Sequence, residues 1–162
     1  RINMIYEGTN TIQSLDLLGR KILGNNGATL RKFGKLVGAL VAEEGVNEKM
    51  AEFITPIAIL GEQMTKFTTE IGFKGFQNPD GGGAAAVDYL RVAGHLVFGY
   101  FFARMAQVAL REIAAGNADP FYLAKLQTAR FYFAKLFPET ATLMRTARAG
   151  SKSLMDTDAA LA

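Results

Sequence analysis

The sequence of 162 residues predicts an all-α fold, an up-and-down antiparallel bundle of long helices. Three observations support this prediction. Apolar residues recur every three or four positions along most of the chain, which is the period of a helix with one buried face. Short clusters of glycine, asparagine and proline interrupt these stripes, and short loops make consecutive helices antiparallel. No run of four to eight residues alternates between apolar and polar side chains as a half-buried strand does.

The first two helices are bounded by strong breaking signals. The first is expected over residues 9–23, with Thr9 or Asn10 as the N-cap, because a short side-chain oxygen can accept from a free amide of the first turn. The run Asn25-Asn26-Gly27 ends it. The second helix is expected over residues 28–44, where apolar residues again recur at helical spacing.

A third helix is expected after Asn47, which can cap it, and extends to about residue 73. Pro56 lies inside this stretch and cannot donate to the carbonyl of Glu52, so we expect one kinked helix. The alternative is a division into two helices, with Thr55 as the N-cap and Pro56 at the first helical position.

The run 78–83, Asn-Pro-Asp-Gly-Gly-Gly, is expected to be an interhelical linker. A glycine-rich loop can cradle phosphate, but this one follows a helix and lacks the Lys-Ser/Thr pair of a P-loop. The longest helix is expected next, over residues 84–115, with large apolar residues available to a core. These are Val87, Leu90, Val97, Phe98, Phe101, Met105, Val108 and Ile113, together with Gly94.

The C-terminal third of the chain contains two more helix signals. Asp119 can cap, and Pro120 can open, a fifth helix that reaches about residue 137. Pro138 then predicts a bend into a shorter helix, which Gly150 ends. Residues 151–162 are expected to be a frayed tail. The core is expected to include Phe33, Phe53, Ile57, Met64, Val97, Phe101 and Phe133.

Composition excludes several classes of function. The 18 basic and 15 acidic residues are scattered, and no run of five like charges supports nucleic-acid binding. The absence of cysteine removes disulfides and thiolate chemistry, which fits a cytoplasmic protein. No signal peptide or charge-free stretch of 18 apolar residues predicts a membrane span. The chain begins with Arg1 in what reads as the middle of a protein, so we expect part of a longer polypeptide.

Few side chains in the helices are suited to chemistry. His95, the only histidine, has Val92 three positions before it, so the Glu-x-x-His pair of di-iron bundles is absent and a core or interface role is expected. The pair Glu43-Glu44 is expected to be solvated. The run Phe131-Tyr132-Phe133 is expected to serve core packing and a subunit contact rather than base stacking, because its rings point in three directions. No metal site is expected, and by elimination the candidate for chemistry is Glu7.

Glu7 lies in the run Ile5-Tyr6-Glu7-Gly8-Thr9, directly before the first helix. Gly8 has no Cβ, so the backbone can bend there or approach a ligand closely. The carboxylate of Glu7 would be held before a helix N-terminus, where free N–H groups favour anions. Such a position suits phosphate binding, or a base held against a substrate.

This run, followed by Ile12-Gln13 and Gly19-Arg20-Lys21, resembles the end of the catalytic domain of the acyl-CoA dehydrogenases, the flavin enzymes of fatty-acid oxidation. The remainder is similar, less specifically, to the extra helical C-terminal domain of some longer members. The resemblance implies three parts: residues 1–24 as the end of the catalytic domain, residues 25–150 as a helical C-terminal domain, and residues 151–162 as a flexible tail.

The resemblance also implies roles for residues near Glu7. Glu7 falls on the base that removes the α-proton of a fatty acyl-CoA, while the β-hydrogen leaves as hydride to FAD and trans-2-enoyl-CoA forms. Its backbone N–H falls on a donor to the thioester carbonyl, where enolate charge develops. Tyr6 and Gly8 fall on substrate-binding positions. Three further residues fall on FAD contacts, although the second replaces the Gln or Gly of many relatives: Thr9, Thr11 and Gln13.

The partners that the resemblance implies are an acyl-CoA substrate and an electron-transfer flavoprotein. The flavin-binding β-domain and most of the acyl pocket are not in this sequence, so the chain alone is expected neither to retain FAD nor to turn over substrate. A homo-oligomer is also expected, through an apolar patch of Ile12, Leu15 and Leu18. The alternative is a non-catalytic helical interaction module whose first 20 or so residues are a remnant.

Overall fold

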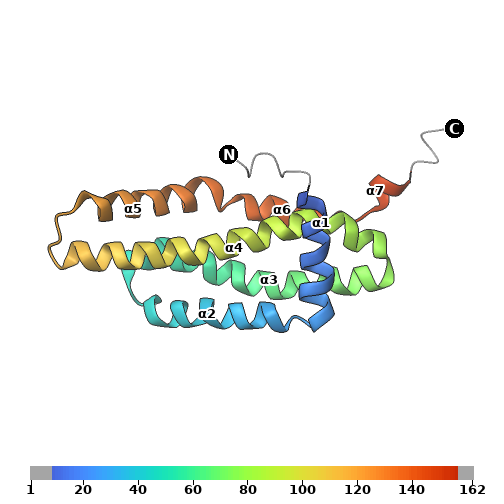
Figure 1. The fold of residues 1–162 in the computed structure, drawn as a ribbon, viewed down its shortest axis with the longest axis horizontal. Coiled ribbons are helices and arrows are strands. Elements are labelled where there is room, and N and C mark those ends of the chain that lie inside the picture. Colours follow the sequence, from blue (N-terminus) through green and yellow to red (C-terminus); the bar gives the residue numbers. More distant parts are fainter. Residues whose placement is uncertain (1–8, 157–162) are drawn as a thin grey trace. The chain divides into compact units, whose positions relative to one another are not determined.

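The structure, a computed structural model, describes residues 9–156, and nearly all of them are helical. No strand occurs within this range, so the predicted all-α class is confirmed. In chain order the elements are α1 (Asn10–Leu15), the π-helix η3 (Asp16–Ile22), the 3₁₀-helix η4 (Leu23–Asn25), α2 (Ala28–Glu44), the 3₁₀-helix η5 (Glu48–Met50), α3 (Ala51–Gln77), α4 (Pro79–Ala114), α5 (Pro120–Phe131), the π-helix η6 (Tyr132–Leu136), α6 (Glu139–Arg148) and α7 (Lys152–Met155) (Figure 1).

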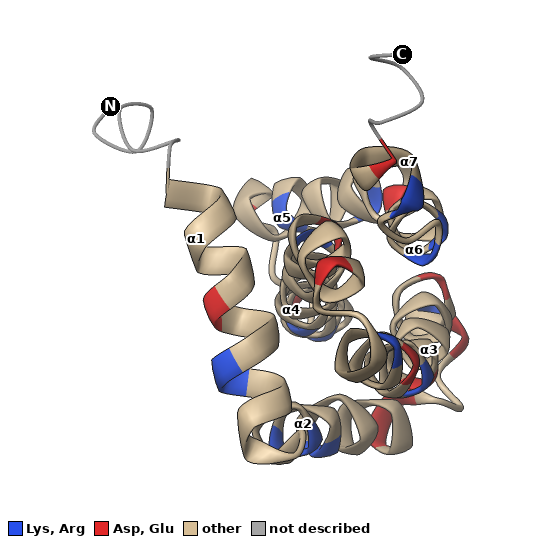
Figure 2. Ribbon diagram, turned by 90° about the vertical axis from the view of Figure 1, so that its right-hand side faces the viewer, with Lys and Arg blue, Asp and Glu red and all other residues tan. Residues whose placement is uncertain are grey.

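The chain forms two compact units that share its two longest helices. Unit 1 comprises Arg1–Arg31, Met64–Ala93 and Ala141–Ala162, and unit 2 comprises Lys32–Gln63 and Gly94–Thr140. The boundaries fall within α3 and α4, so each of these helices contributes one part to each unit. Figure 2 shows basic and acidic residues interspersed along the helices, as the scattered charges of the sequence predicted.

Unit 2 is an up-and-down arrangement of four helical segments, from α2, α3, α4 and α5, in which consecutive segments run in opposite directions (Figure 1). The side-chain contacts agree with this order. Segments two apart should be parallel, and along α2 and α4 the ring of Phe33 packs on Tyr100 while Glu43 is bonded to Gln107. The predicted antiparallel bundle is therefore confirmed.

Several predicted boundaries are confirmed by the structure. The bounds of α2 are those expected, and α3 is a single helix with Pro56 inside it, as the first of the two alternatives predicted. Asn47 accepts a hydrogen bond from the amide of Lys49 at 3.2 Å and so caps η5. Asp119 caps α5 by accepting from the amide of Phe121 at 2.9 Å. Each of these signals acts through residues close in sequence, which is why the sequence reveals them.

The predicted linker at residues 78–83 is wrong, because only Asn78 separates α3 from α4 and the glycines lie within the first turns of α4. Pro79 has its φ pre-set for the first helical position, and the side chain of Asn78 caps the helix. Glycine weakens a helix by about 1 kcal/mol per residue. Here it also permits a close approach: a Cβ on Gly75 would lie 3.4 Å from the Cα of Gly82.

Most of the predicted core is confirmed. Phe53, Ile57, Met64 and Phe133 are buried, and Phe33 is half-buried. Inside unit 2, the rings of Phe53 and Phe133 meet edge to face with centroids 5.4 Å apart. Such aromatic pairs contribute about 0.5–1.5 kcal/mol beyond the apolar area that they bury.

The predicted core face of α4 is wrong. Val97 and Phe101, expected inside, are 38% and 60% exposed. The buried side of this helix in unit 2 carries smaller side chains instead, including Leu96, Ala103 and Ala106. Because α4 is apolar on all sides, the largest residues did not indicate which side faces the core. The small residues allow neighbouring helices to approach closely.

Unit 1 has its own polar contact within an aromatic interior. The rings of Phe67 and Tyr89 stack with centroids 5.7 Å apart, and the Tyr89 hydroxyl lies 2.8 Å from the hydroxyl of Thr68. Burial raises the pKa of Tyr89 above its ordinary value. Within the expected tail, Ser151 is buried and accepts a hydrogen bond from Asn78 at 3.3 Å. Residues 157–162 lie outside the described part of the chain.

Candidate functional site

The structure describes half of the site that the sequence predicts. Tyr6, Glu7 and Gly8 lie outside the described residues. Thr9, at the N-cap position of α1, and the two helical residues Thr11 and Gln13 are described, and all three residues are exposed.

The first turn of α1 divides the three residues expected to contact FAD. Successive helical residues are rotated by about 100°, so residues four apart share a face. Thr9 and Gln13 therefore lie on one side, and Thr11 lies on another. Thr9 is the N-cap residue, as the first of the two alternatives predicted, but its side chain makes no capping hydrogen bond, so the predicted bond is wrong. A ligand lying against one side of α1 can therefore contact Thr9 and Gln13 together more readily than all three residues.

Buried side chains hold α1 and η3 in unit 1. Ser14 is fully buried, and its hydroxyl donates to the backbone oxygen of Thr11 at 2.6 Å. Leu18 is buried as well, whereas Ile12 and Leu15 are 67% and 47% exposed. Of the three residues expected to form an exposed apolar patch, only Ile12 and Leu15 are therefore exposed.

The π-helix η3 carries a local ion-pair group. Asp16 lies 2.6 Å from Nε of Arg20 and 3.1 Å from Nζ of Lys21. The hydrogen bond from Lys21, together with that from Arg20, holds the pKa of Asp16 below its ordinary value. π-Helical turns often occur at functional sites, and this one follows directly after the residues that the sequence singled out.

A second polar group, in unit 2, joins His95 to residues that sequence reasoning did not connect with it. The hydroxyl of Tyr132 lies 2.9 Å from Nδ1 of His95 and 3.3 Å from its backbone oxygen. Nε2 of His95 lies 3.2 Å from Oε2 of Glu139. Burial raises the pKa of the Tyr132 phenol well above its ordinary value.

This group can satisfy either protonation state of the histidine. With neutral His95, Tyr132 donates to Nδ1 and Nε2–H donates to Glu139. With the imidazolium, Nδ1–H donates to Tyr132, whose hydroxyl then donates to the backbone oxygen of His95. His95 was expected to be a core or interface residue, and the structure adds a polar partner for each of its ring nitrogens. No signal in the sequence could have found Glu139, which is 44 residues away.

The prediction that Glu43 and Glu44 form a solvated pair is wrong for Glu44, which is buried in unit 2. Nε2 of Gln107 donates to both carboxylates, at 2.8 Å in the case of Glu43. Asn47 donates to the second oxygen of Glu44 at 2.7 Å. These donors come from the following loop and from α4, so they compensate for the burial of a charge that its own helix does not stabilise.

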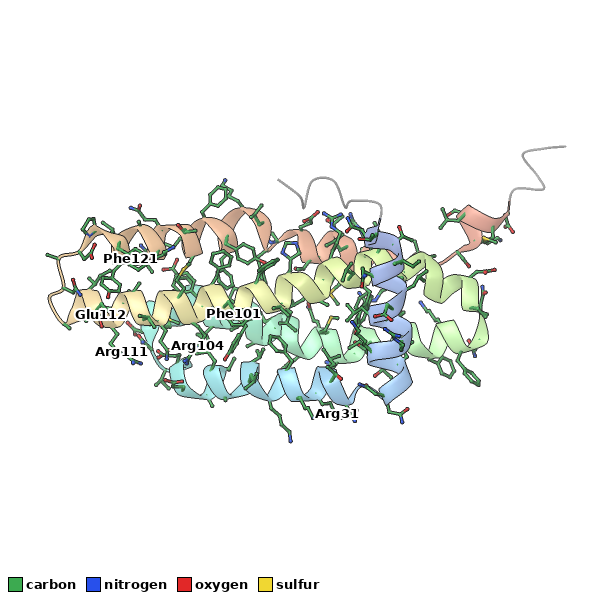
Figure 3. The ribbon with its side chains drawn as sticks, in the orientation of Figure 1. Arg31, Phe101, Arg104, Arg111, Glu112 and Phe121 are labelled. Carbon is green, nitrogen blue, oxygen red and sulfur yellow. The ribbon has the colours of Figure 1, made fainter. Side chains whose placement is uncertain are left out.

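One cavity lies in unit 1 and another in unit 2, and neither of these two is lined by Thr9, Thr11 or Gln13. The cavity in unit 1 measures about 330 Å³ and has Arg31 among its lining residues (Figure 3). Arg31 donates to the backbone oxygen of Asn26. The cavity in unit 2 measures about 240 Å³ and adjoins Glu44. Both are at or below the lower end of the volumes usual for ligand pockets.

Two classes of site are not found within residues 9–156. No group of three or more histidine, aspartate or glutamate side chains there could hold a metal ion. None of the helices in that range combines the length and the hydropathy that a membrane span requires.

Comparison with known proteins indicates a relationship for most of the chain. Residues 29–158 match the model of a family described as "Acetyl-CoA dehydrogenase C-terminal like". The chain is 32% identical over 142 residues to the 3-methylmercaptopropionyl-CoA dehydrogenase of Ruegeria pomeroyi, covering 86% of this chain and 24% of the relative. It is 26% identical over 163 residues to a butyryl-CoA dehydrogenase of Syntrophomonas wolfei, covering 96% of this chain and 26% of the relative.

A broad-specificity linear acyl-CoA dehydrogenase of Mycobacterium tuberculosis is 24% identical over 180 residues, covering 99% of this chain and 28% of the relative. The chain thus spans about a quarter of the length of these relatives. The family match begins at residue 29, near the start of α2, so it covers α2 to α7 but neither α1, η3 and η4 nor the residues predicted for catalysis.

Proposed function

Because this chain belongs to the family described as acetyl-CoA dehydrogenase C-terminal like, we propose that it is the C-terminal portion of an FAD-dependent acyl-CoA dehydrogenase. The observation that carries the proposal is the order of two signals along the chain. The run Tyr6-Glu7-Gly8-Thr9 comes directly before the residues of α1 in the sequence, and the family match covers the later helices, from α2 on. Three relatives named as acyl-CoA dehydrogenases support the same reading.

In the proposed reaction Glu7 is the base. Its carboxylate removes the α-proton of a fatty acyl-CoA and becomes a carboxylic acid, while a double bond forms between the α and β carbons. FAD supplies the acceptor for the β-hydrogen, which leaves as hydride. The backbone N–H of Glu7 donates to the thioester oxygen, where negative charge develops. Gly8, which has no Cβ, would leave room for the thioester, and Tyr6 would contribute to substrate binding.

The flavin contacts are proposed for α1. Thr9 and Gln13 are exposed and share one side of the helix, so their hydroxyl and amide groups would hydrogen-bond to polar atoms of the flavin. Thr11 lies on a different face, so its contact would be to a different part of the cofactor. No cavity is needed on this chain for such contacts, because α1 presents a surface that the rest of an enzyme can complete.

The remaining helices would then form an accessory domain. The proposed division places the end of the catalytic domain at residues 1–24, the helical domain at 25–150 and a tail at 151–162. We assign the complete enzyme to the cytoplasm, with an electron-transfer flavoprotein as the oxidant of its reduced flavin. The chain by itself is inactive in this proposal, because it lacks most of the acyl pocket.

The test is the substitution Glu7→Gln in the complete enzyme. Glutamine keeps the size and the hydrogen-bonding capacity of glutamate but removes its basicity. A positioned base contributes roughly 10²- to 10⁴-fold to rate, so flavin reduction by acyl-CoA should fall at least 100-fold. FAD content and acyl-CoA affinity should be unchanged. The exposed Glu62 provides a matched control, because Glu62→Gln makes the same chemical change within the helical domain. Near-normal flavin reduction by Glu7→Gln would show that the base lies elsewhere.

A non-catalytic helical interaction module is the second candidate. The observation that favours it is the start of the family match at residue 29, which leaves Glu7 outside. The flavin absorption spectrum of the complete protein distinguishes the two candidates. A purified protein that never carries flavin, even after incubation with FAD, would support the interaction module.

A further inference from the structure

The larger of the two cavities lies in unit 1 and has a single charged side chain at its wall. It measures about 330 Å³ and is bordered by the turn after η3, by the first residues of α2 and by residues 65–73 of α3. Among the described residues that line it, Arg31 alone carries a charge. Figure 3 shows Arg31 at the start of α2. The cavity therefore has one cationic end.

A tight turn fixes the position of Arg31. Asn26 and Gly27 have positive φ angles of 53° and 72°, and the amide of Gly27 donates to the backbone oxygen of Ile22 at 2.8 Å. Nη1 of Arg31 donates to the backbone oxygen of Asn26. A Cβ on Gly27 would lie 3.3 Å from this Nη1, so a larger residue would crowd the guanidinium. The turn thus both holds the guanidinium and leaves space for it.

The remaining donors of Arg31 have no acidic partner. None of the carboxylates between residues 9 and 156 forms an ion pair with it. A guanidinium has five N–H donors in a planar fork, which matches the two oxygens of a carboxylate. Arg31 is exposed, so a ligand can reach it from the solvent. It can therefore bind a carboxylate without first breaking an ion pair.

The rest of the cavity is suited to an apolar group. Leu23 and Leu30, both half-buried, and the ring of Phe73 contribute apolar surface to its wall. The hydroxyls of Thr68 and Thr69 donate to backbone oxygens of their own helix, at 2.7 and 3.1 Å. Their protons are therefore already engaged, and these two threonines do not provide donors for a second polar group on a ligand.

We propose that this cavity binds an aliphatic monocarboxylate of about six to eight carbons, with its carboxylate on Arg31 and its chain against Leu23 and Leu30. A volume of about 330 Å³ equals that of about ten water molecules in the liquid. Octanoate, with eight carbons and two oxygens, is a ligand of that size. The second carboxylate of a dicarboxylate would find no cation among the described lining residues.

This site differs from the proposed catalytic turn. A coenzyme A thioester is far larger than the cavity, and its acyl group has no free carboxylate for Arg31. Thr9, Thr11 and Gln13, the residues proposed to contact FAD, do not line the cavity. The inference therefore goes beyond the proposed function and does not depend on it.

The size of the cavity sets the expected affinities. A ligand of about ten non-hydrogen atoms that is only partly enclosed should bind with a dissociation constant on the order of 0.1–1 mM. Each CH₂ added between butyrate and octanoate should tighten binding about two- to fourfold, because it buries more apolar surface. Dodecanoate should bind no more tightly than octanoate, since its last carbons would lie outside the cavity.

Nuclear magnetic resonance of the ¹⁵N-labelled chain tests the site. Sodium octanoate added to about 10 mM should shift the amides of residues 26–31 and 65–73 in a saturable manner. 1-Octanol, which has the same chain without the charge, should bind at least tenfold more weakly. Absence of a saturable shift at these residues would overturn the proposal. Equal affinity for octanol, or affinity that keeps rising up to dodecanoate, would also overturn it.

Two glutamine variants test the role of the charge. Arg31→Gln should raise the dissociation constant for octanoate at least tenfold, because it removes a charge-assisted pair of hydrogen bonds. Arg145→Gln is the matched control, since Arg145 is exposed in unit 1 and does not line the cavity, and it should leave the constant unchanged. Circular dichroism establishes that both variants remain folded. Equal weakening by the two substitutions would exclude Arg31 as the carboxylate's partner.

Inorganic phosphate distinguishes a carboxylate site from a general anion site. It carries charge but has no apolar chain, so it should bind at least tenfold more weakly than octanoate at the same amides. Phosphate that shifts residues 26–31 with the affinity of octanoate would show that the apolar wall contributes nothing, and it would overturn the assignment to an aliphatic carboxylate.

Discussion

Glu44 is a buried acidic residue whose unfavourable position is compensated by hydrogen bonds from its neighbours. It lies at the C-terminal end of α2, where the helix dipole disfavours a carboxylate, and it is 8% exposed. Gln107 and Asn47 donate to its two oxygens. These hydrogen bonds replace those that the carboxylate would make to water if it were exposed. A buried carboxylate of this kind depends on its donors, because an unsatisfied charge in the interior is costly.

The first prediction follows from this dependence. Gln107→Leu removes a donor to both Glu43 and Glu44 and leaves the buried carboxylate of Glu44 without its partner from α4. The free energy of unfolding should fall by about 1–3 kcal/mol in urea denaturation. Gln127→Leu makes the same change on an exposed part of α5 and should cost less than about 0.5 kcal/mol. Equal effects of the two substitutions would contradict the role given to Gln107.

Tyr132 leads to the second prediction, which concerns pH. Burial raises its pKa in the folded state above that in the unfolded chain. The contribution of the protonated Tyr132 phenol to the free energy of unfolding is therefore fully present below the unfolded pKa of about 10. It is lost progressively as the pH rises above that value, because the unfolded chain then loses the proton more readily than the folded one. Stability measured from pH 8 to 11 should fall less steeply for Tyr132→Phe than for the wild type, since lysine titration is common to both. Identical slopes would contradict the prediction, and Tyr122→Phe serves as the control.

At the scale of elements, the sequence predicted where helices begin and end better than which side of each faces the interior. The signals at Asn47 and Asp119 act within two residues, so they can be read without knowing the fold. The orientation of α4 depends on long-range packing. Because α4 is apolar all round, Phe101 and Ala103 were equally plausible core residues, and only the neighbouring helices decide between them.

Two glycines of α4 give the third prediction. A Cβ on Gly99 would lie 2.7 Å from a ring carbon of Phe137 and 3.0 Å from a methyl of Ile57, whereas no atom lies within 4 Å of a Cβ on Gly94. Gly94→Ala should stabilise the chain by about 0.5–1 kcal/mol through helix propensity alone. Gly99→Ala makes the same gain but forces buried side chains apart, and it should destabilise by about 1–3 kcal/mol. Thermal unfolding of both variants checks the opposite signs, and a shift in the same direction would contradict this packing.

At the scale of the whole molecule, the sequence predicted the fold class correctly but did not predict the polar contacts between helices. The run around Glu7 is contiguous, so its resemblance to a catalytic motif could be recognised without a structure. The contacts from His95 to Glu139 and from Glu44 to Gln107 join residues 44 and 63 positions apart. No short-range pattern encodes such pairs, and they form only when the helices pack.

The last prediction concerns the chain on its own. Thr9, Thr11 and Gln13 are exposed at the start of α1, so these residues offer FAD a surface rather than an enclosing pocket. Ligand sites normally enclose most of the surface of a bound molecule. The purified chain should therefore show no flavin absorbance after incubation with FAD and gel filtration, and no acyl-CoA oxidation with FAD added. Stoichiometric flavin retention would contradict this and would mean that the helical units alone form the cofactor site. Flavin retained by the complete enzyme but not by the chain would be the expected pair of results, because the remaining surface of the cofactor would then be covered by the part of the enzyme that this chain does not contain.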